Sequence, residues 1–159
     1  MSRDASPDSP VTAPHGAWRS PFPISLLVDG YVGLRETRIE GDDVYWIETR
    51  PDEGGRQVVV RRRSNGTTED VSAPGINARN RVHEYGGGSY VVVGGTVCHA
   101  SWTDGRWYRR DPDGASRPIT PDGPFRYADA IHDREHGRLI AVREDHSRPG
   151  EAVNSIVSI

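Results

Sequence analysis

Short apolar runs separated by turn-forming residues dominate the chain after its N-terminal region. The runs are rich in β-branched and aromatic side chains, as in Val44–Ile47, Val58–Val60 and Tyr90–Val93. Such residues favour strands, and no segment shows a sustained helical period. The dipeptides Asn65-Gly66 and Asp113-Gly114 lie between runs and accept positive φ, which suits tight hairpins. The pattern therefore predicts antiparallel strands joined by short turns.

A longer motif occurs twice in the chain, with an offset of 48 residues from Gly66 to Gly114. Residues 60–72 and 108–120 each run from an apolar strand through a basic pair, a Gly turn and a polar strand to an apolar residue and a hydroxyl. A second element, an apolar run that follows a Gly turn, occurs three times, at Gly41, Gly95 and Gly137. A period of roughly 40 to 50 residues built from short strands is typical of β-propeller blades.

The repeats predict an all-β fold of propeller blades, each with four antiparallel strands. The blades are expected at about residues 34–72, 88–120 and 126–159. The third copy reaches only its third strand, so we expect about two and a half blades, an incomplete propeller that belongs to a longer polypeptide. Residues 1–17, rich in Ser, Asp and Pro, are expected to form a disordered leader, and residues 18–33 a short helical lead-in. The alternative is a small open sandwich or barrel of about ten strands.

Composition excludes several classes of function. The 23 acidic residues outnumber 20 basic ones, all of them Arg, and the net charge of −3 argues against nucleic-acid binding. A single cysteine, Cys98, allows no intrachain disulfide and no multi-thiolate metal site, which fits a cytoplasmic protein. No apolar stretch is long enough to span a bilayer, so no membrane role is expected. We expect Cys98 to be a small buried residue and six aromatic residues to form inter-sheet core: Tyr45, Trp46, Tyr90, Trp102, Trp107 and Tyr108.

The densest motif of the chain is Arg81–Gly88. Together with Tyr45-Trp46, Tyr127–Asp129, Arg143–His146 and the leader Ala13–Pro21, it resembles the N-terminal propeller of bacterial peptidases of the prolyl oligopeptidase family, in the dipeptidyl aminopeptidase and acylaminoacyl-peptidase branch. The resemblance covers Ala13–Ile159. It implies a parent protein in which a propeller of about seven blades caps a C-terminal α/β-hydrolase domain with a Ser, Asp and His triad. Family members cleave short peptides by acyl transfer.

Motifs for catalysis and metal binding are incomplete. Ser89 comes nearest to a Gly-x-Ser-x-Gly nucleophile elbow, but Val91 replaces the last Gly and a strand follows instead of a helix. The pair His83-Glu84 lacks the second His of a His-Glu-x-x-His zinc motif, because Gly87 stands there. We therefore expect no catalytic residue, no metal and no cofactor in this chain, and no activity of the chain alone.

The candidate site residues come from the inter-blade segment: His83, Glu84 and Tyr85. They either lie at the propeller's channel or rim and touch a peptide substrate, or fasten neighbouring blades through buried hydrogen bonds. The residues that follow are expected to permit close approach of backbone segments: Gly86, Gly87 and Gly88.

The expected function is that of the substrate-gating propeller portion of a serine peptidase. Its expected partners are a peptide substrate and the C-terminal α/β-hydrolase domain of the same polypeptide. One alternative is a non-catalytic propeller interaction module, since a fold alone does not fix function. A second is a glycan hydrolase acting within the channel, which needs paired carboxylates; Glu84 and Asp129 are candidates by position.

Overall fold

The computed structural model describes residues 12–18, 20–28 and 30–159, and the chain divides into two compact units, Met1–Tyr31 and Val32–Ile159. The first unit contains helix α1 (Ile24–Val28), within the predicted helical lead-in. Residues 1–11 of the predicted leader lie outside the described residues. No helix in the described ranges is long and apolar enough to cross a membrane.

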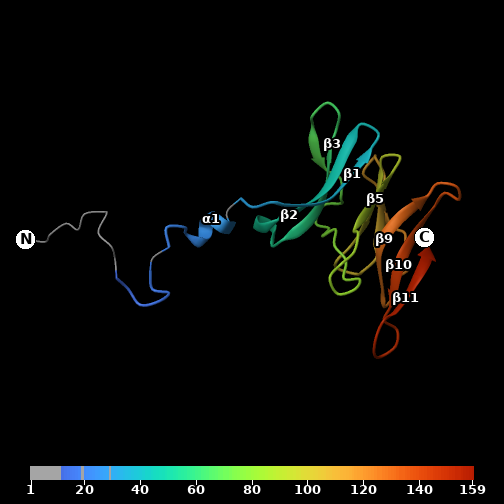
Figure 1. Ribbon diagram of the computed structural model, residues 1–159. Helices are drawn as coiled ribbons and strands as arrows, with labels where there is room; N and C mark the ends of the chain where they lie inside the picture. Colours follow the sequence, from blue (N-terminus) through green and yellow to red (C-terminus); the bar gives the residue numbers. More distant parts are fainter. Residues whose placement is uncertain (1–11, 19, 29) are drawn as a thin grey trace, which may run out of the picture. The chain divides into compact units, whose positions relative to one another are not determined.

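The second unit consists of three antiparallel sheets (Figure 1). The first sheet contains β1 (Gly33–Glu40), β2 (Asp43–Arg50), β3 (Arg56–Arg62) and β4 (Thr68–Asp70), with a 3-10 turn, η1 (Pro51–Glu53), between β2 and β3. The second contains β5 (Tyr90–Val93), β6 (Thr96–Ala100), β7 (Trp107–Arg110) and β8 (Ser116–Pro118). The third contains β9 (Phe125–Asp133), β10 (Arg138–Asp145) and β11 (Val153–Ser158). In each sheet, strands adjacent in sequence are adjacent in space, which confirms the predicted all-β fold of incomplete propeller blades.

The 48-residue repeat is reproduced in the register of the first two sheets. Val60 of β3 pairs with Asp70 of β4, and Tyr108 of β7 pairs with Pro118 of β8. Both members of the second pair lie 48 positions after those of the first. Val60 and Tyr108 therefore occupy equivalent third strands, as the repeat predicts.

The turns of these two hairpins also match. Gly66 and Gly114 adopt positive φ, of 87° and 89°. The side chains of Asn65 and Asp113 each accept a hydrogen bond from the amide two residues further on, at 3.0 and 2.9 Å. Glycine supplies the left-handed conformation without steric cost, while Asn or Asp fixes the turn through its own side chain.

The hydroxyl that ends each copy of the repeat extends the ladder between the third and fourth strands. The Ser72 hydroxyl accepts a hydrogen bond from the Val59 amide at 3.2 Å, and the Thr120 hydroxyl accepts one from the Trp107 amide at 2.9 Å. All four residues are buried. The hydroxyls therefore satisfy amides that have no further strand residue to bind.

We expect Thr120→Val to destabilise the fold by about 1–3 kcal/mol, because it leaves the buried Trp107 amide without an acceptor while nearly preserving volume. Urea unfolding monitored by circular dichroism measures the loss. Thr120→Ser, which keeps the hydroxyl, is the matched control and should remain close to the original stability. Equal stability of the Val and Ser variants would contradict this role of the hydroxyl.

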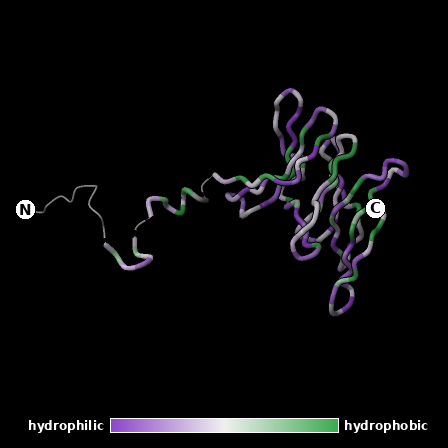
Figure 2. The backbone as a smooth tube through the Cα atoms, viewed as in Figure 1, coloured by the Kyte–Doolittle hydropathy of each residue, from purple (hydrophilic) through white to green (hydrophobic). Residues whose placement is uncertain are grey.

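The inner strands of the second sheet pack against a neighbouring sheet on each face. Tyr90 and Val92 pack toward the first sheet with Tyr45, Ile47 and Val59. On its other face, Val91, Cys98 and Trp107 pack toward the third sheet with Tyr127, Leu139 and Ala141. Burial raises the pKa of the Cys98 thiol to about 11, so the thiol stays protonated at neutral pH. In Figure 2 the loops at residues 134–137 and 146–151 are hydrophilic, whereas the strands carry the hydrophobic residues.

Three of the six aromatic residues expected in the core are only partly buried: Trp46, Trp102 and Tyr108. The Trp46 indole donates to Glu48 and the Tyr108 hydroxyl donates to Asp104. Trp102 lies beneath arginine side chains. The expectation was wrong for these residues because strand alternation does not reveal that an aromatic ring packs against polar groups at the surface.

The connections at the two ends of the sheets differ in length (Figure 1). At one end, the strands are joined by short hairpins such as those at residues 41–42 and 94–95. At the other end, longer segments connect them: 71–89, 101–106, 119–124 and 146–152. These segments line common pockets, so the polar and aromatic residues of separate loops meet there. Loops of this kind, positioned by a rigid scaffold, commonly carry function.

Candidate functional site

A single buried asparagine shapes the predicted site segment. The side-chain oxygen of Asn80 (Oδ1) accepts hydrogen bonds from the amides of Val82 and Gly87, at 3.2 and 2.9 Å. Its amide group donates to the Gly87 carbonyl oxygen and to the Ser89 hydroxyl. Val82 is fully buried and anchors the loop from inside. Hydrogen bonds from the Asn80 side chain to Gly87 and Ser89 therefore close the segment between Asn80 and Ser89 into a loop.

This anchored loop holds two consecutive residues in the left-handed conformation: His83 has φ 56° and Glu84 has φ 62°. The Glu84 amide donates to Arg81 and the Tyr85 amide donates to His83. The three predicted site residues project outward, and Tyr85 is 92% exposed. Non-glycine residues in this conformation are strained and persist where the surrounding structure holds them, often at functional sites.

Glu144, at the end of β10, holds the loop from the third sheet. Its carboxylate accepts the His83 amide at 2.6 Å and lies 3.0 Å from the His146 imidazole and 3.9 Å from the Arg126 guanidinium. Burial acts to raise the pKa of Glu144, but the His83 amide, His146 and Arg126 outweigh it, so the pKa lies below its usual value. The carboxylate is therefore ionised and acts as a fixed acceptor.

Two bulged inner strands hold the far end of the loop. Glu36 in β1 and Asp129 in β9 both have positive φ, of 52° and 55°, and each lies four residues before the end of its strand. The Glu36 carboxylate accepts the Ser89 amide at 2.8 Å, and the Asp129 carboxylate accepts the Gly88 amide at 2.6 Å. Equivalent bulges of the first and third sheets thus hold the start of the second sheet between them.

At Gly86, Gly87 and Gly88 a larger residue would be disfavoured for different steric reasons. A Cβ at Gly87 would lie 2.3 Å from an Asp129 carboxylate oxygen, and one at Gly88 would lie 3.1 Å from the other oxygen. Gly86 has φ 84°, and its Cβ would lie 3.2 Å from the Asn80 carbonyl oxygen. The side chains of Asp129 and Ala128 therefore require glycine most strongly at position 87.

Two residues weighed for chemistry have structural contacts instead. Ser89 is 3% exposed, and its hydroxyl accepts from Asn80 and donates to the Gly87 carbonyl. The Asp129 carboxylate is bound to the Gly88 amide. Within the described part of the chain, no three His, Cys, Asp or Glu side chains are grouped to hold a metal ion.

A cleft of about 530 Å³ lies beside the loop. His83 and Glu84 line it together with Glu151, and Arg126, Glu144 and His146 also contribute. Tyr85 does not line this cleft. The sequence did not predict Arg126, Glu144 and His146 as site residues. Two of them, Glu144 and His146, nevertheless belong to the segment Arg143–His146, which is part of the family resemblance. The cleft offers carboxylates, imidazoles and a guanidinium, groups that bind polar and charged parts of peptides.

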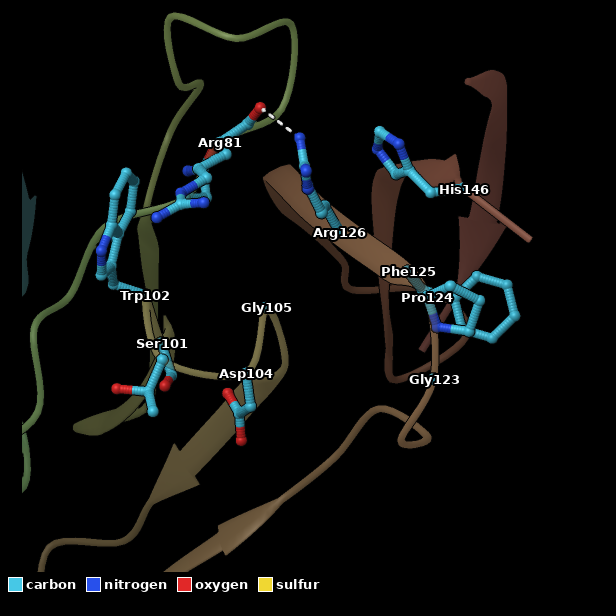
Figure 3. Close-up of a pocket in the computed structure, with 12 residues that line it drawn as sticks. Arg81, Ser101, Trp102, Asp104, Gly105, Gly123, Pro124, Phe125, Arg126 and His146 are labelled. Atoms are coloured by element: carbon cyan, nitrogen blue, oxygen red, sulfur yellow. Dashed lines mark hydrogen bonds between the residues drawn. The ribbon is translucent and has the colours of Figure 1, made fainter. Parts of the chain in front are cut away.

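A second pocket, of about 280 Å³, adjoins the cleft and shares Arg126 and His146 with it. Figure 3 shows Arg81 and Trp102 on one side of this pocket and His146, Pro124 and Phe125 on the other. Segments from the second and third sheets thus form one continuous polar surface at the loop end.

The chain is similar to solved structures of puromycin-hydrolysing enzymes. It is 30% identical to puromycin hydrolase over 92% of this chain, with a TM-score of 0.77. A mutant of puromycin hydrolase complexed with PGG gives 31% identity over 92% and a TM-score of 0.78. A Mycobacterium tuberculosis puromycin-hydrolyzing peptidase gives 32% identity over 94% and a TM-score of 0.78. The chain spans only 24–25% of the length of these proteins. No protein-family model and no curated protein sequence matches it.

Proposed function

We propose that this chain is the substrate-gating propeller portion of a cytoplasmic serine peptidase of the prolyl oligopeptidase family, in the dipeptidyl aminopeptidase and acylaminoacyl-peptidase branch. The similarity to puromycin-hydrolysing enzymes over nearly the whole chain is the observation that carries this proposal. Acyl transfer takes place in an α/β-hydrolase domain of the same polypeptide. The propeller admits short peptides and shapes the space in which they bind.

The site geometry supports a role in contacting the substrate. His83, Glu84 and Tyr85 are exposed on a loop whose backbone is fixed by Asn80 and Glu144. A rigid backbone that presents exposed side chains loses little entropy when a ligand binds. The exposed carboxylates of Glu84 and Glu151 favour positively charged groups of a peptide in the cleft.

The outward faces of the first and third sheets support the presence of further blades. Leu34 and Ile39 of β1 are 66% and 74% exposed, and Ile131 and Ile156 of the third sheet are 62% and 71% exposed. Large apolar side chains on a sheet face favour packing against another layer. Additional sheets of the same polypeptide would cover these side chains.

The coding sequence downstream of Ile159 provides the test of this proposal. We expect the reading frame to continue through further blades into a domain with a Gly-x-Ser-x-Gly elbow. The longer protein should react with a serine-directed phosphonate and hydrolyse short peptides, whereas the 159-residue chain should do neither. A reading frame without a hydrolase domain would favour the non-catalytic interaction module.

A Glu84→Ala variant of the longer protein tests the loop's part in this function. We expect its kcat/KM to change by about tenfold for some peptides and little for others, with phosphonate labelling retained. Glu53→Ala, in the exposed turn η1, is the matched control. Loss of serine labelling in the folded Glu84→Ala protein would point to a direct catalytic role instead.

A further inference from the structure

The pocket of about 280 Å³ between the second and third sheets combines arginines with aromatic walls (Figure 3). The Arg81 guanidinium lies 3.9 Å from the centroid of the Trp102 ring, and the Arg79 guanidinium lies 4.5 Å from it. Trp102 is further fixed by a hydrogen bond from its amide to the Asn77 carbonyl at 3.0 Å. The indole therefore stacks with two guanidinium groups, of which that of Arg81 lines the pocket.

These cations lack nearby counterions. Among the described residues, no carboxylate lies within ion-pair distance of Arg79 or Arg81. By contrast, Arg50 and Arg61 of the first sheet form ion pairs at 2.7 and 2.6 Å with Asp70 and Glu69, respectively. The positive charge at the pocket is therefore available to a ligand.

Arg126 lines both this pocket and the neighbouring cleft. Its guanidinium makes one long hydrogen bond, of 3.5 Å, to the Arg81 carbonyl and lies 3.9 Å from Glu144. A guanidinium has five N–H donors in a planar fork that matches a carboxylate. Among the residues that the structure describes, most of these donors have no acceptor at Arg126, and in Figure 3 the side chain extends toward Arg81.

The acidic residue that lines the pocket, Asp104, already has hydrogen-bond donors of its own. The Asp104 carboxylate accepts the Tyr108 hydroxyl at 2.6 Å and the Arg106 amide at 3.2 Å. Burial acts to raise the pKa of Asp104, but these hydrogen bonds outweigh it, and the pKa is lowered. The carboxylate is thus ionised and held toward Tyr108 and Arg106, whereas Arg81 and Arg126 contribute two positive charges to the same pocket.

We propose that this pocket binds the terminal carboxylate of a short peptide or N-acylated amino acid, with Arg126 and Arg81 on the carboxylate and Trp102 and Phe125 against the adjacent apolar side chain. The volume suits one residue, not a folded partner. The proposal does not depend on the peptidase function, because the pocket lies entirely within this chain.

N-acetylphenylalanine and its uncharged amide are the probes for this site. The 15N-labelled chain has four tryptophans, whose indole N–H signals can be assigned by single Trp→Phe replacements. We expect N-acetylphenylalanine to shift the Trp102 signal in a saturable way, and the amide to bind at least tenfold more weakly. Acetate, which lacks the aromatic side chain, should also bind weakly. Trp46, in the first sheet, should not respond.

Matched variants identify the arginines involved. Arg126→Gln and Arg81→Gln should each weaken binding about tenfold. Arg62→Gln, at an exposed arginine of β3 that forms no ion pair with a described residue, should leave binding unchanged. The Trp107 indole, bonded to the Tyr127 carbonyl, reports whether each variant remains folded. If Arg126→Gln is unfolded, Arg126→Lys replaces it and should bind several-fold more weakly, because lysine lacks the planar fork.

Equal binding of the acid and the amide would overturn the proposal, as would a Trp102 signal that does not respond or unchanged affinity in both pocket variants. Failure of the longer protein to react with a phosphonate would count against the peptidase function only. The two outcomes are therefore distinguishable.

Discussion

A Gly87→Ala variant is expected to lose about 2–4 kcal/mol of unfolding free energy. The added methyl group would lie 2.3 Å from an Asp129 carboxylate oxygen and 2.9 Å from the Ala128 Cβ. Asp129 cannot turn aside freely, because its other oxygen accepts the Gly88 amide at 2.6 Å. Relief of the clash therefore requires either loss of that hydrogen bond or separation of the second and third sheets. Urea unfolding measures the change.

Gly54→Ala is the control that separates steric clash from backbone strain. Gly54 has φ 67° and open space around its Cβ position, so alanine there should cost only about 1 kcal/mol. Asp129→Gly in the Gly87→Ala background should restore part of the lost stability, because it removes the carboxylate from the clash. Similar losses at positions 54 and 87 would show that the sheets do not meet at Gly87 as described.

Removal of the Glu144 carboxylate is the second large effect. Glu144→Ala should destabilise the fold by about 2–3 kcal/mol, because the His83 amide loses its acceptor and Arg126 and His146 lose their counterion. Hydrogen exchange at the His83 amide should accelerate more than the change in global stability explains. Glu151→Gln, in the same cleft but exposed, is the matched control and should change stability by less than about 0.5 kcal/mol.

The dependence on pH follows from the lowered pKa of Glu144. The unfolded state takes up a proton on this carboxylate at a higher pH than the folded state does, so its contribution is complete above the ordinary glutamate range. The contribution is lost as the pH falls through the folded-state pKa. Glu144→Gln should therefore show a weaker loss of stability in acid than the original chain. Parallel profiles for the two proteins would contradict the assignment.

Strands and blade repeats could be predicted from the sequence because their determinants are local. Apolar runs and Gly turns lie within a few residues of each other, and the 48-residue offset correctly predicted that Val60 and Tyr108 occupy equivalent strands. The hydroxyls at Ser72 and Thr120 were visible as part of the repeat. Their role as hydrogen-bond acceptors could not be predicted, because it depends on β3 and β7 being longer than the fourth strands with which they pair.

The carboxylates that hold the site loop in place could not be predicted, because they are distant from the loop in the sequence. The Glu144 contact to His83 spans 61 residues, and the Glu36 contact to Ser89 spans 53. No local pattern distinguishes such a carboxylate from one on a solvated strand. The segment containing His83 and Glu84 was predicted as a site only because its motif is dense. Trp102 was wrongly predicted to lie in the core, because tryptophan is also the residue type that stacks with arginine at a partly exposed position.

The difference between the two ends of the sheets constrains how this protein can diverge. At the hairpin end, Gly66 and Gly114 and the side chains before them fix the turns, so substitutions there disturb strand register. At the other end, the exposed residues 147–151 can change in length and sequence while the ladder between β10 and β11 persists. Descendants of one ancestral sheet could thus acquire new ligand preferences without refolding, and homologous chains should vary most at residues 147–151 and least at the hairpin glycines.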